Sequence, residues 1–129
     1  MPNNLSRTGG GEPAADALRR TGFHADVGTL DGSVVVSLHG ELDMATAPAL
    51  DQALASAFDG GGSSVIIDLA SLTFMDSTGI AVLLSAGRRA KEAGQTLVVR
   101  SPRRPVLKAF RLTGVDQILA IEPNETLTT

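Results

Sequence analysis

The chain has 129 residues, the length of one ordinary domain, and its hydrophobic fraction of 43% is sufficient for a buried core. A net charge of −3, with four Phe and no Trp or Tyr, argues against nucleic-acid binding. The absence of Cys excludes disulfides, thiolate metal sites and a cysteine nucleophile. Because no segment resembles a signal peptide or a membrane-spanning helix, we expect a cytoplasmic protein that contacts neither membrane nor nucleic acid.

The N-terminal residues differ in composition from the rest of the chain. Residues 1–20 are rich in Gly, Pro, Asn and Ala, with a short helix over 14–20 as the alternative to a mobile tail. We therefore predict a flexible N-terminal extension over residues 1–22 and a single domain over 23–129.

The hydrophobic pattern becomes regular after this extension. Apolar and polar residues alternate from Phe23 to Thr29, which predicts a half-buried strand. Asp31-Gly32 then predicts a tight hairpin turn into a second strand over 34–38. Thr46 is the expected N-cap of the first helix, with Pro48 in its first turn. Further helices are expected over 77–92 and around 106–110 up to Gly114, and further strands over 64–69, 96–100 and 117–121.

The order of these elements predicts the fold class. A hairpin followed by strand–helix–strand units indicates an α/β fold, because such crossovers place parallel strands side by side. We predict one domain with a mixed β-sheet and helices packed on it. Pro105 leaves the start of the last helix open.

Few residues have the spacing of a catalytic or metal site. His24 and His39, the two histidines, lack metal-ligand spacing and are expected to face solvent or a sheet edge. Ser77 lies in Met-Asp-Ser-Thr-Gly rather than in a G-x-S-x-G elbow, which disfavours a hydrolase. The sequence does not exclude a Ser-His-Asp triad, because the members of such a triad come together in the fold and need not be close in the sequence. The pairs Arg88-Arg89 and Arg103-Arg104 are expected at solvated helix ends, with a partner contact as the alternative.

Two segments carry a stronger signal. Gly40-Glu41-Leu42-Asp43 is expected as a turn with acidic residues ahead of the first helix. Residues 72–79 precede and open the central helix, where either Asp76 or Ser77 is a suitable N-cap. This second segment is expected beyond the C-terminal end of the strand over 64–69, where α/β folds present their sites.

Taken together, GELD at 40–43 and FMDSTG at 74–79 resemble the signature segments of the STAS domain, specifically of bacterial anti-sigma factor antagonists. The elements between them and SP…LKAFRLTGV at 101–115 fit that family, and the resemblance covers about residues 23–122. It implies a STAS-type fold. The family usually ends with a further helix, for which this chain leaves room for about one turn.

The resemblance implies a protein-binding switch rather than an enzyme. Family members bind an anti-sigma factor, typically a serine kinase of the histidine-kinase-like ATPase fold, and so release a sigma factor. The kinase phosphorylates the serine of D-S-[ST]-G, here Ser77, and a PP2C-type phosphatase resets it. By the same resemblance the partner-binding positions are Asp43, Asp76, Ser77, Thr78 and Gly79.

No cofactor or metal follows from the resemblance, because the kinase partner would bring the ATP. The alternative is a STAS domain that acts as a structural or interaction module, in a signalling assembly or in a lipid-transport complex. Copurification with a transporter ATPase would distinguish it. The sequence identifies neither the sigma factor nor the activating signal.

Overall fold

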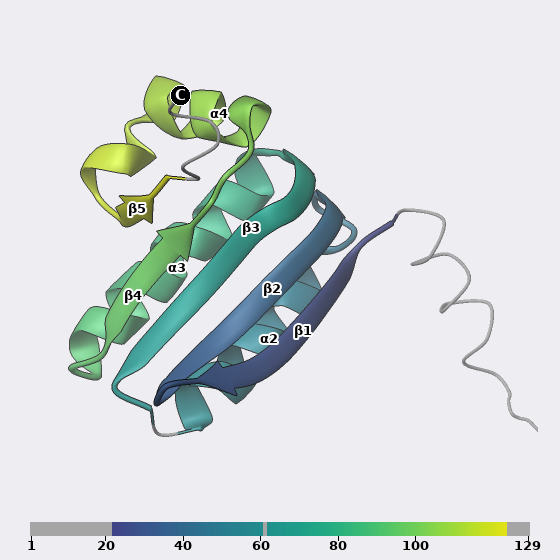
Figure 1. Cartoon of the computed structure of the whole chain (residues 1–129). Coiled ribbons are helices and arrows are strands. Elements are labelled where there is room, and N and C mark those ends of the chain that lie inside the picture. The colour runs from purple at the N-terminus through teal and green to yellow at the C-terminus, as the bar shows by residue number, and fades with distance from the viewer. Residues whose placement is uncertain (1–21, 61, 124–129) are drawn as a thin grey trace, which may run out of the picture.

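The computed structural model describes residues 22–60 and 62–123 (Figure 1). The described elements follow the predicted order of a hairpin and three strand–helix–strand units. They are β1 (His24–Leu30), β2 (Ser33–Leu42), α2 (Ala47–Asp59), β3 (Ser64–Met75), α3 (Ser77–Glu92), β4 (Thr96–Arg100), α4 (Arg104–Thr113), the 3-10 helix η2 (Val115–Gln117) and β5 (Ala120–Glu122). The predicted extension, apart from Gly22, and the turn expected near the C-terminus lie outside the described residues.

The strands form one five-stranded sheet in the order β1-β2-β3-β4-β5. β1 and β2 pair antiparallel, whereas the other neighbours pair parallel, so the predicted mixed sheet is confirmed. Asp31 and Gly32 join the hairpin with φ values of 51° and 83°. Both values are positive, as a type I′ turn requires, which explains why this dipeptide stands there.

The core lies between one face of the sheet and the helices. α2 and α3 lie side by side behind the sheet in Figure 1, and α4 lies beyond one end of it. Alternate residues of β2 and β3 point into this core and are fully or almost fully buried: Val34, Val36, Leu38, Val65, Ile67 and Leu69. Leu54 of α2, Leu83 of α3 and Phe110 of α4 belong to the same cluster. Each such side chain contributes about 1.5–3 kcal/mol of burial free energy.

The central strands are longer than the sequence predicts. β2 continues to Leu42 and β3 to Met75, so residues 40–42 lie in a strand and not in the predicted turn. Ser71 and Thr73 interrupt the apolar run of β3, and hydrophobicity alone therefore ends that strand too early. The register shifts twice along this pair, between Ser37 and His39 and between Gly40 and Glu41.

The other helices and the last strand differ less from expectation. α3 has the predicted bounds, and α4 begins at Arg104 with Pro105 in its first turn and ends at Gly114, which has φ 80°. The last strand is predicted over 117–121, but η2 covers 115–117 and β5 begins only at Ala120. The physical reason is that Val115 is buried and holds η2 against the core. The carbonyl oxygen of Val115 accepts a hydrogen bond from the backbone N–H of Leu119 at 2.9 Å. No described helix has the length and hydropathy needed to cross a membrane.

Candidate functional site

The two signature segments meet at the carboxyl ends of β2 and β3. Leu42 lies opposite Met75 in the strand register, and Glu41 lies opposite Phe74. The backbone N–H of Asp76 then donates to the carbonyl oxygen of Leu42 at 3.1 Å. Segments more than thirty residues apart in the chain therefore form one continuous edge of the sheet, where parallel α/β folds place their sites.

Asp76 caps the helix that follows. Its Oδ1 accepts hydrogen bonds from the backbone N–H groups of Thr78 at 2.9 Å and Gly79 at 3.2 Å. Both groups would otherwise lack an acceptor in the first turn of α3, and such a cap is worth about 1 kcal/mol. The prediction that Asp76 or Ser77 caps the helix is confirmed for Asp76.

Ser77 is the first residue of α3 and is exposed, whereas Thr78 is half-buried. The position combines access with favourable electrostatics. Backbone N–H groups and the helix dipole at an N-terminus favour a nearby anion, so an added negative charge here does not oppose the helix.

Gly79 is buried, and packing explains why it is glycine. A Cβ at this position would lie 2.7 Å from Cγ of Met75 and 2.8 Å from Cδ2 of Leu42. No side chain fits there without displacing its neighbours. Gly79 thus lets the first turn of α3, which begins with Ser77, approach the ends of β2 and β3 closely.

Asp43 holds the loop between β2 and α2. Its Oδ1 accepts from the backbone N–H groups of Ala45 at 3.0 Å and Thr46 at 3.1 Å. Thr46 occupies the predicted N-cap position, but its side chain makes no cap hydrogen bond. Its hydroxyl, on a residue only 1% exposed, instead donates to the carbonyl oxygen of Glu41 at 3.1 Å and accepts from the N–H of Asp43 at 2.9 Å. Hydrogen bonds among its own residues therefore hold the loop in place.

Two apolar side chains beside these residues are absent from the sequence prediction. Met44 is 75% exposed and Phe74 is 46% exposed, although Met75 next to Phe74 is buried. Strand alternation explains the contrast, because successive side chains point to opposite faces. We call the group of residues Asp43, Met44, Phe74 and Ser77, which lie at or just beyond the carboxyl ends of β2 and β3, the motif edge. The Phe-Met pair ahead of the cap is the signal in the sequence, but only the register shows which of the two faces outward.

Gly40, the first residue of the other segment, also has a structural reason. Its φ is +90°, and a Cβ there would lie 1.5 Å from the carbonyl oxygen of Gly22. Its own carbonyl oxygen accepts from the hydroxyl of Thr73 at 3.0 Å. The absence of a Cβ allows the chain that enters β1 to pass close to the backbone of β2 at Gly40.

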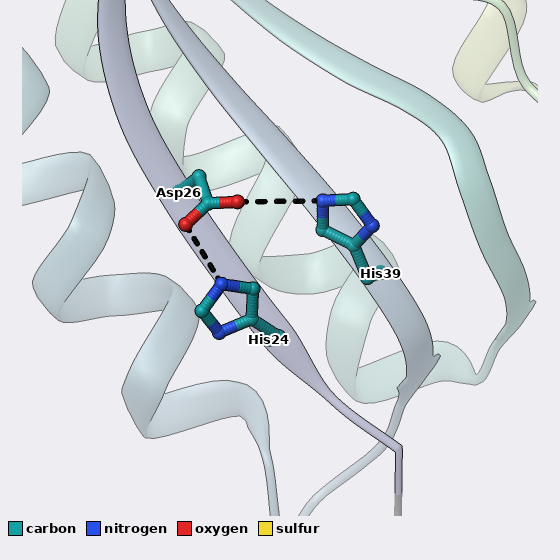
Figure 2. A network of polar contacts seen from close by, with 3 residues as sticks. All are labelled: His24, Asp26 and His39. Atoms are coloured by element: carbon teal, nitrogen blue, oxygen red, sulfur yellow. Dashed lines mark hydrogen bonds and ion pairs between the residues drawn. The ribbon is translucent and has the colours of Figure 1, made fainter.

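The two histidines face solvent from the hairpin, as predicted. His24 and His39 lie directly opposite each other in the antiparallel register. Figure 2 shows the carboxylate of Asp26 between them, 2.7 Å from Nε2 of His24 and 3.6 Å from Nε2 of His39. In the described part of the chain no group of three or more His, Cys, Asp or Glu side chains is arranged to hold a metal ion.

Comparison with known proteins places this geometry in a family. A family model described as "Mlab, STAS domain" matches residues 25–121. The chain is 28% identical over 99 residues to an anti-sigma-B factor antagonist of Bacillus subtilis (strain 168), a match that covers 77% of this chain and 90% of that protein.

Solved structures give the same picture. The crystal structure of an anti-sigma factor antagonist from Mycobacterium paratuberculosis has a TM-score of 0.68 at 34% identity, covering 82% of this chain and 92% of that one. The unphosphorylated form of the anti-sigma factor antagonist SpoIIAA has a TM-score of 0.66 at 22% identity, covering 81% and 93%, which is a likeness of fold. The chain therefore belongs to the STAS domain family, with relatives named as anti-sigma factor antagonists.

Proposed function

We propose that this protein is an anti-sigma factor antagonist that binds a serine-kinase anti-sigma factor through the motif edge and thereby releases a sigma factor. Phosphorylation of Ser77 ends the binding. The observation that carries the proposal is the exposed Ser77 hydroxyl at the capped N-terminus of α3, beside the segment that contains Asp43. The names of the relatives support the choice of partner.

The composition of the motif edge suits a protein partner. Exposed Met44 and Phe74 supply apolar area, and aromatic and Met side chains are enriched in the cores of protein interfaces. Asp43 supplies charge: among described residues only its Oδ1 accepts hydrogen bonds, which leaves Oδ2 for a cation of the partner. A partner with an apolar pocket beside a Lys or Arg matches this surface.

A phosphate on Ser77 changes the electrostatics of that surface without unfolding it. Phosphorylation adds about −1.5 to −2 charges at neutral pH, and a helix N-terminus tolerates them. Against a carboxylate of the partner, two like unit charges about 6 Å apart repel each other by roughly 0.7 kcal/mol in water and by roughly 2.8 kcal/mol at an effective dielectric of 20. A 100-fold loss of affinity needs about 2.7 kcal/mol. Local repulsion and desolvation therefore suffice to release the partner.

Asp76 serves the unmodified state in this proposal. The capping geometry engages its Oδ1 with two backbone N–H groups, so the carboxylate cannot move to hold a phosphate without giving up the cap. The negative charge of Asp76, next to Ser77, adds to the repulsion between a phosphate on Ser77 and a carboxylate of the partner. The cap meanwhile fixes the first turn of α3, and with it the direction in which Ser77 is presented to the kinase.

The direct test is phosphorylation by the anti-sigma factor of the same host. With that kinase and ATP, the protein should gain one phosphate, which a PP2C-type phosphatase then removes. Ser77→Ala should gain none, whereas Thr78→Ala, the matched control one residue away, should still gain one. A phosphate mapped to Thr78 in the wild type contradicts the proposal. Copurification with a transporter ATPase in place of an anti-sigma factor would favour the structural-module alternative.

A further inference from the structure

α4 presents a row of cations on the face opposite the core. Arg104, Lys108 and Arg111 are exposed, whereas Val106 and Phe110 are buried. The three cations are spaced four and three residues apart, which places them within an arc of about 60° on the helix surface. No Asp or Glu lies in α4 to balance them. We call Arg104, Lys108, Arg111 and the neighbouring Leu112 the basic stripe.

Fold stability does not account for the charges of Arg104 and Lys108, whereas Arg111 lies in the last turn of α4, where a cation agrees with the helix dipole. The described ion pairs join Asp26 to the two histidines and Asp68 to Arg100, and none includes a residue of the stripe. Arg104 is the first residue of α4, and Arg103 before it occupies the N-cap without a side-chain cap hydrogen bond. Cations at a helix N-terminus oppose the helix dipole. The protein therefore keeps the positive charge of Arg104 where it weakens the helix.

An apolar side chain accompanies the cations. Leu112 is 78% exposed and lies four residues after Lys108, so the two side chains are neighbours on the helix surface. An exposed Leu beside Arg and Lys gains nothing from contact with solvent. The same combination is typical of protein interfaces, where Arg is enriched and apolar groups fill the centre. The stripe thus has both an electrostatic and an apolar component.

The stripe follows the carboxyl end of β4, just as Ser77 follows the carboxyl end of β3. β3 and β4 pair parallel, and α3 and α4 follow directly on their carboxyl ends. α4 also packs against β3, and Figure 1 shows it beyond the upper ends of these strands. β2 is two strands from β4, a lateral spacing of about 10 Å, and Asp43 lies six residues beyond Ser37, the residue of β2 in register with Asp68 and Arg100. Acidic residues therefore lie at the carboxyl end of β2, and basic residues follow the carboxyl end of β4.

We propose that the basic stripe is a second docking element for the anti-sigma factor and that it receives an acidic protein segment carrying two or three carboxylates and an apolar side chain. The proposal rests on the function proposed above. A protein segment fits better than a polyanion, because the stripe is only about 10 Å long on a chain of net charge −3. Nucleic acid and anionic bilayers bind through broader basic surfaces.

Two substitutions test the stripe by calorimetric titration against the purified anti-sigma factor of the same host. Lys108→Glu should weaken binding by about tenfold at low salt, and the loss should shrink as salt screens the charges. Its matched control is Lys91→Glu, the same change at an exposed position in the last turn of α3, about 20 Å from Ser77 along that helix. The control should bind within about twofold of wild type.

Arg104→Glu separates docking from folding. The new carboxylate agrees with the helix dipole, so the thermal midpoint should rise slightly while the affinity for the anti-sigma factor falls. A residue with a merely structural role would not move these two quantities in opposite directions. Unchanged affinity in both Lys108→Glu and Arg104→Glu overturns the stripe proposal, as does an equal loss in Lys91→Glu.

The outcome for the wild type distinguishes this proposal from the function on which it rests. If the wild type is bound and phosphorylated on Ser77 but the stripe variants bind equally well, the stripe proposal alone fails. If the wild type is neither bound nor phosphorylated, both fail. Loss of binding to phosphatidylglycerol vesicles or to duplex DNA in Lys108→Glu, with unchanged affinity for the anti-sigma factor, assigns the stripe to a polyanion and overturns the proposal.

Discussion

Leu42 and Asp76 are joined by a hydrogen bond from the N–H of Asp76 to the carbonyl oxygen of Leu42, 3.1 Å long. This contact closes the end of the β2–β3 pair and leads directly into the cap of α3. Leu42 also contacts Gly79 closely, since a Cβ there would lie 2.8 Å from its Cδ2. The position of Ser77 therefore depends on residues from both signature segments.

The packing of Gly79 gives the first prediction. Gly79→Ala should lower the free energy of unfolding by about 1–3 kcal/mol, because the new methyl group overlaps Met75 and Leu42 in a closely packed site. Urea unfolding measures it. Gly28→Ala is the control, since a Cβ at Gly28 meets no atom within 4 Å. Equal stability of Gly79→Ala and wild type would show that the glycine stands there for another reason.

The cap of α3 gives the second prediction. Asp76→Ala removes the acceptor for two backbone N–H groups and should cost about 1 kcal/mol in the free energy of unfolding. Asp76→Asn keeps an oxygen in place and should cost less. If the cap presents Ser77 to the kinase, Asp76→Ala should also slow phosphorylation. Unchanged stability together with an unchanged phosphorylation rate would remove both roles from Asp76.

The apolar part of the motif edge gives the third prediction. Phe74→Ala should weaken binding of the anti-sigma factor by about tenfold or more, with little change in stability, because the ring is half-exposed in the free protein. Leu30→Ala is the control: Leu30 is 54% exposed but borders the hairpin turn at the opposite edge of the sheet. Calorimetric titration of both variants decides, and equal affinity losses would argue against a specific role for Phe74.

Charge at Ser77 gives the fourth prediction. Ser77→Asp should weaken partner binding while the thermal midpoint stays nearly fixed, because an acidic residue in the first turn of a helix is tolerated by the dipole. Ser77→Asn, which is similar in size and uncharged, is the control for side-chain shape. If Ser77→Asn and Ser77→Asp bind equally weakly, bulk rather than charge controls the interaction.

Much of the fold was predictable because its signals are local. The bounds of α3 follow from helical periodicity and from a capping residue at Asp76, and the hairpin follows from Asp31-Gly32. The ends of β2 and β3 were not predictable in the same way. There each strand is stabilised by pairing with the other. Because Ser71 and Thr73 are polar, the hydrophobic pattern of β3 does not indicate that the pairing continues. The 3-10 helix before β5 likewise depends on burial of Val115.

The sequence predicts candidate site residues, although not Met44 and Phe74, and it does not predict the structural role of each. The two motifs identify Asp43, Asp76, Ser77 and Gly79, yet only the structure assigns loop closure to Asp43 and close packing to Gly79. The outward orientation of Phe74 depends on a register with two shifts, which no single strand encodes.

The central claim is that negative charge on Ser77 controls partner binding. The most direct measurement is the dissociation constant of the purified anti-sigma factor for the protein stoichiometrically phosphorylated on Ser77, compared with the unmodified protein. Our account predicts an affinity at least about 100-fold lower for the phosphorylated form, with the fold retained. Equal affinities of the two forms would contradict it.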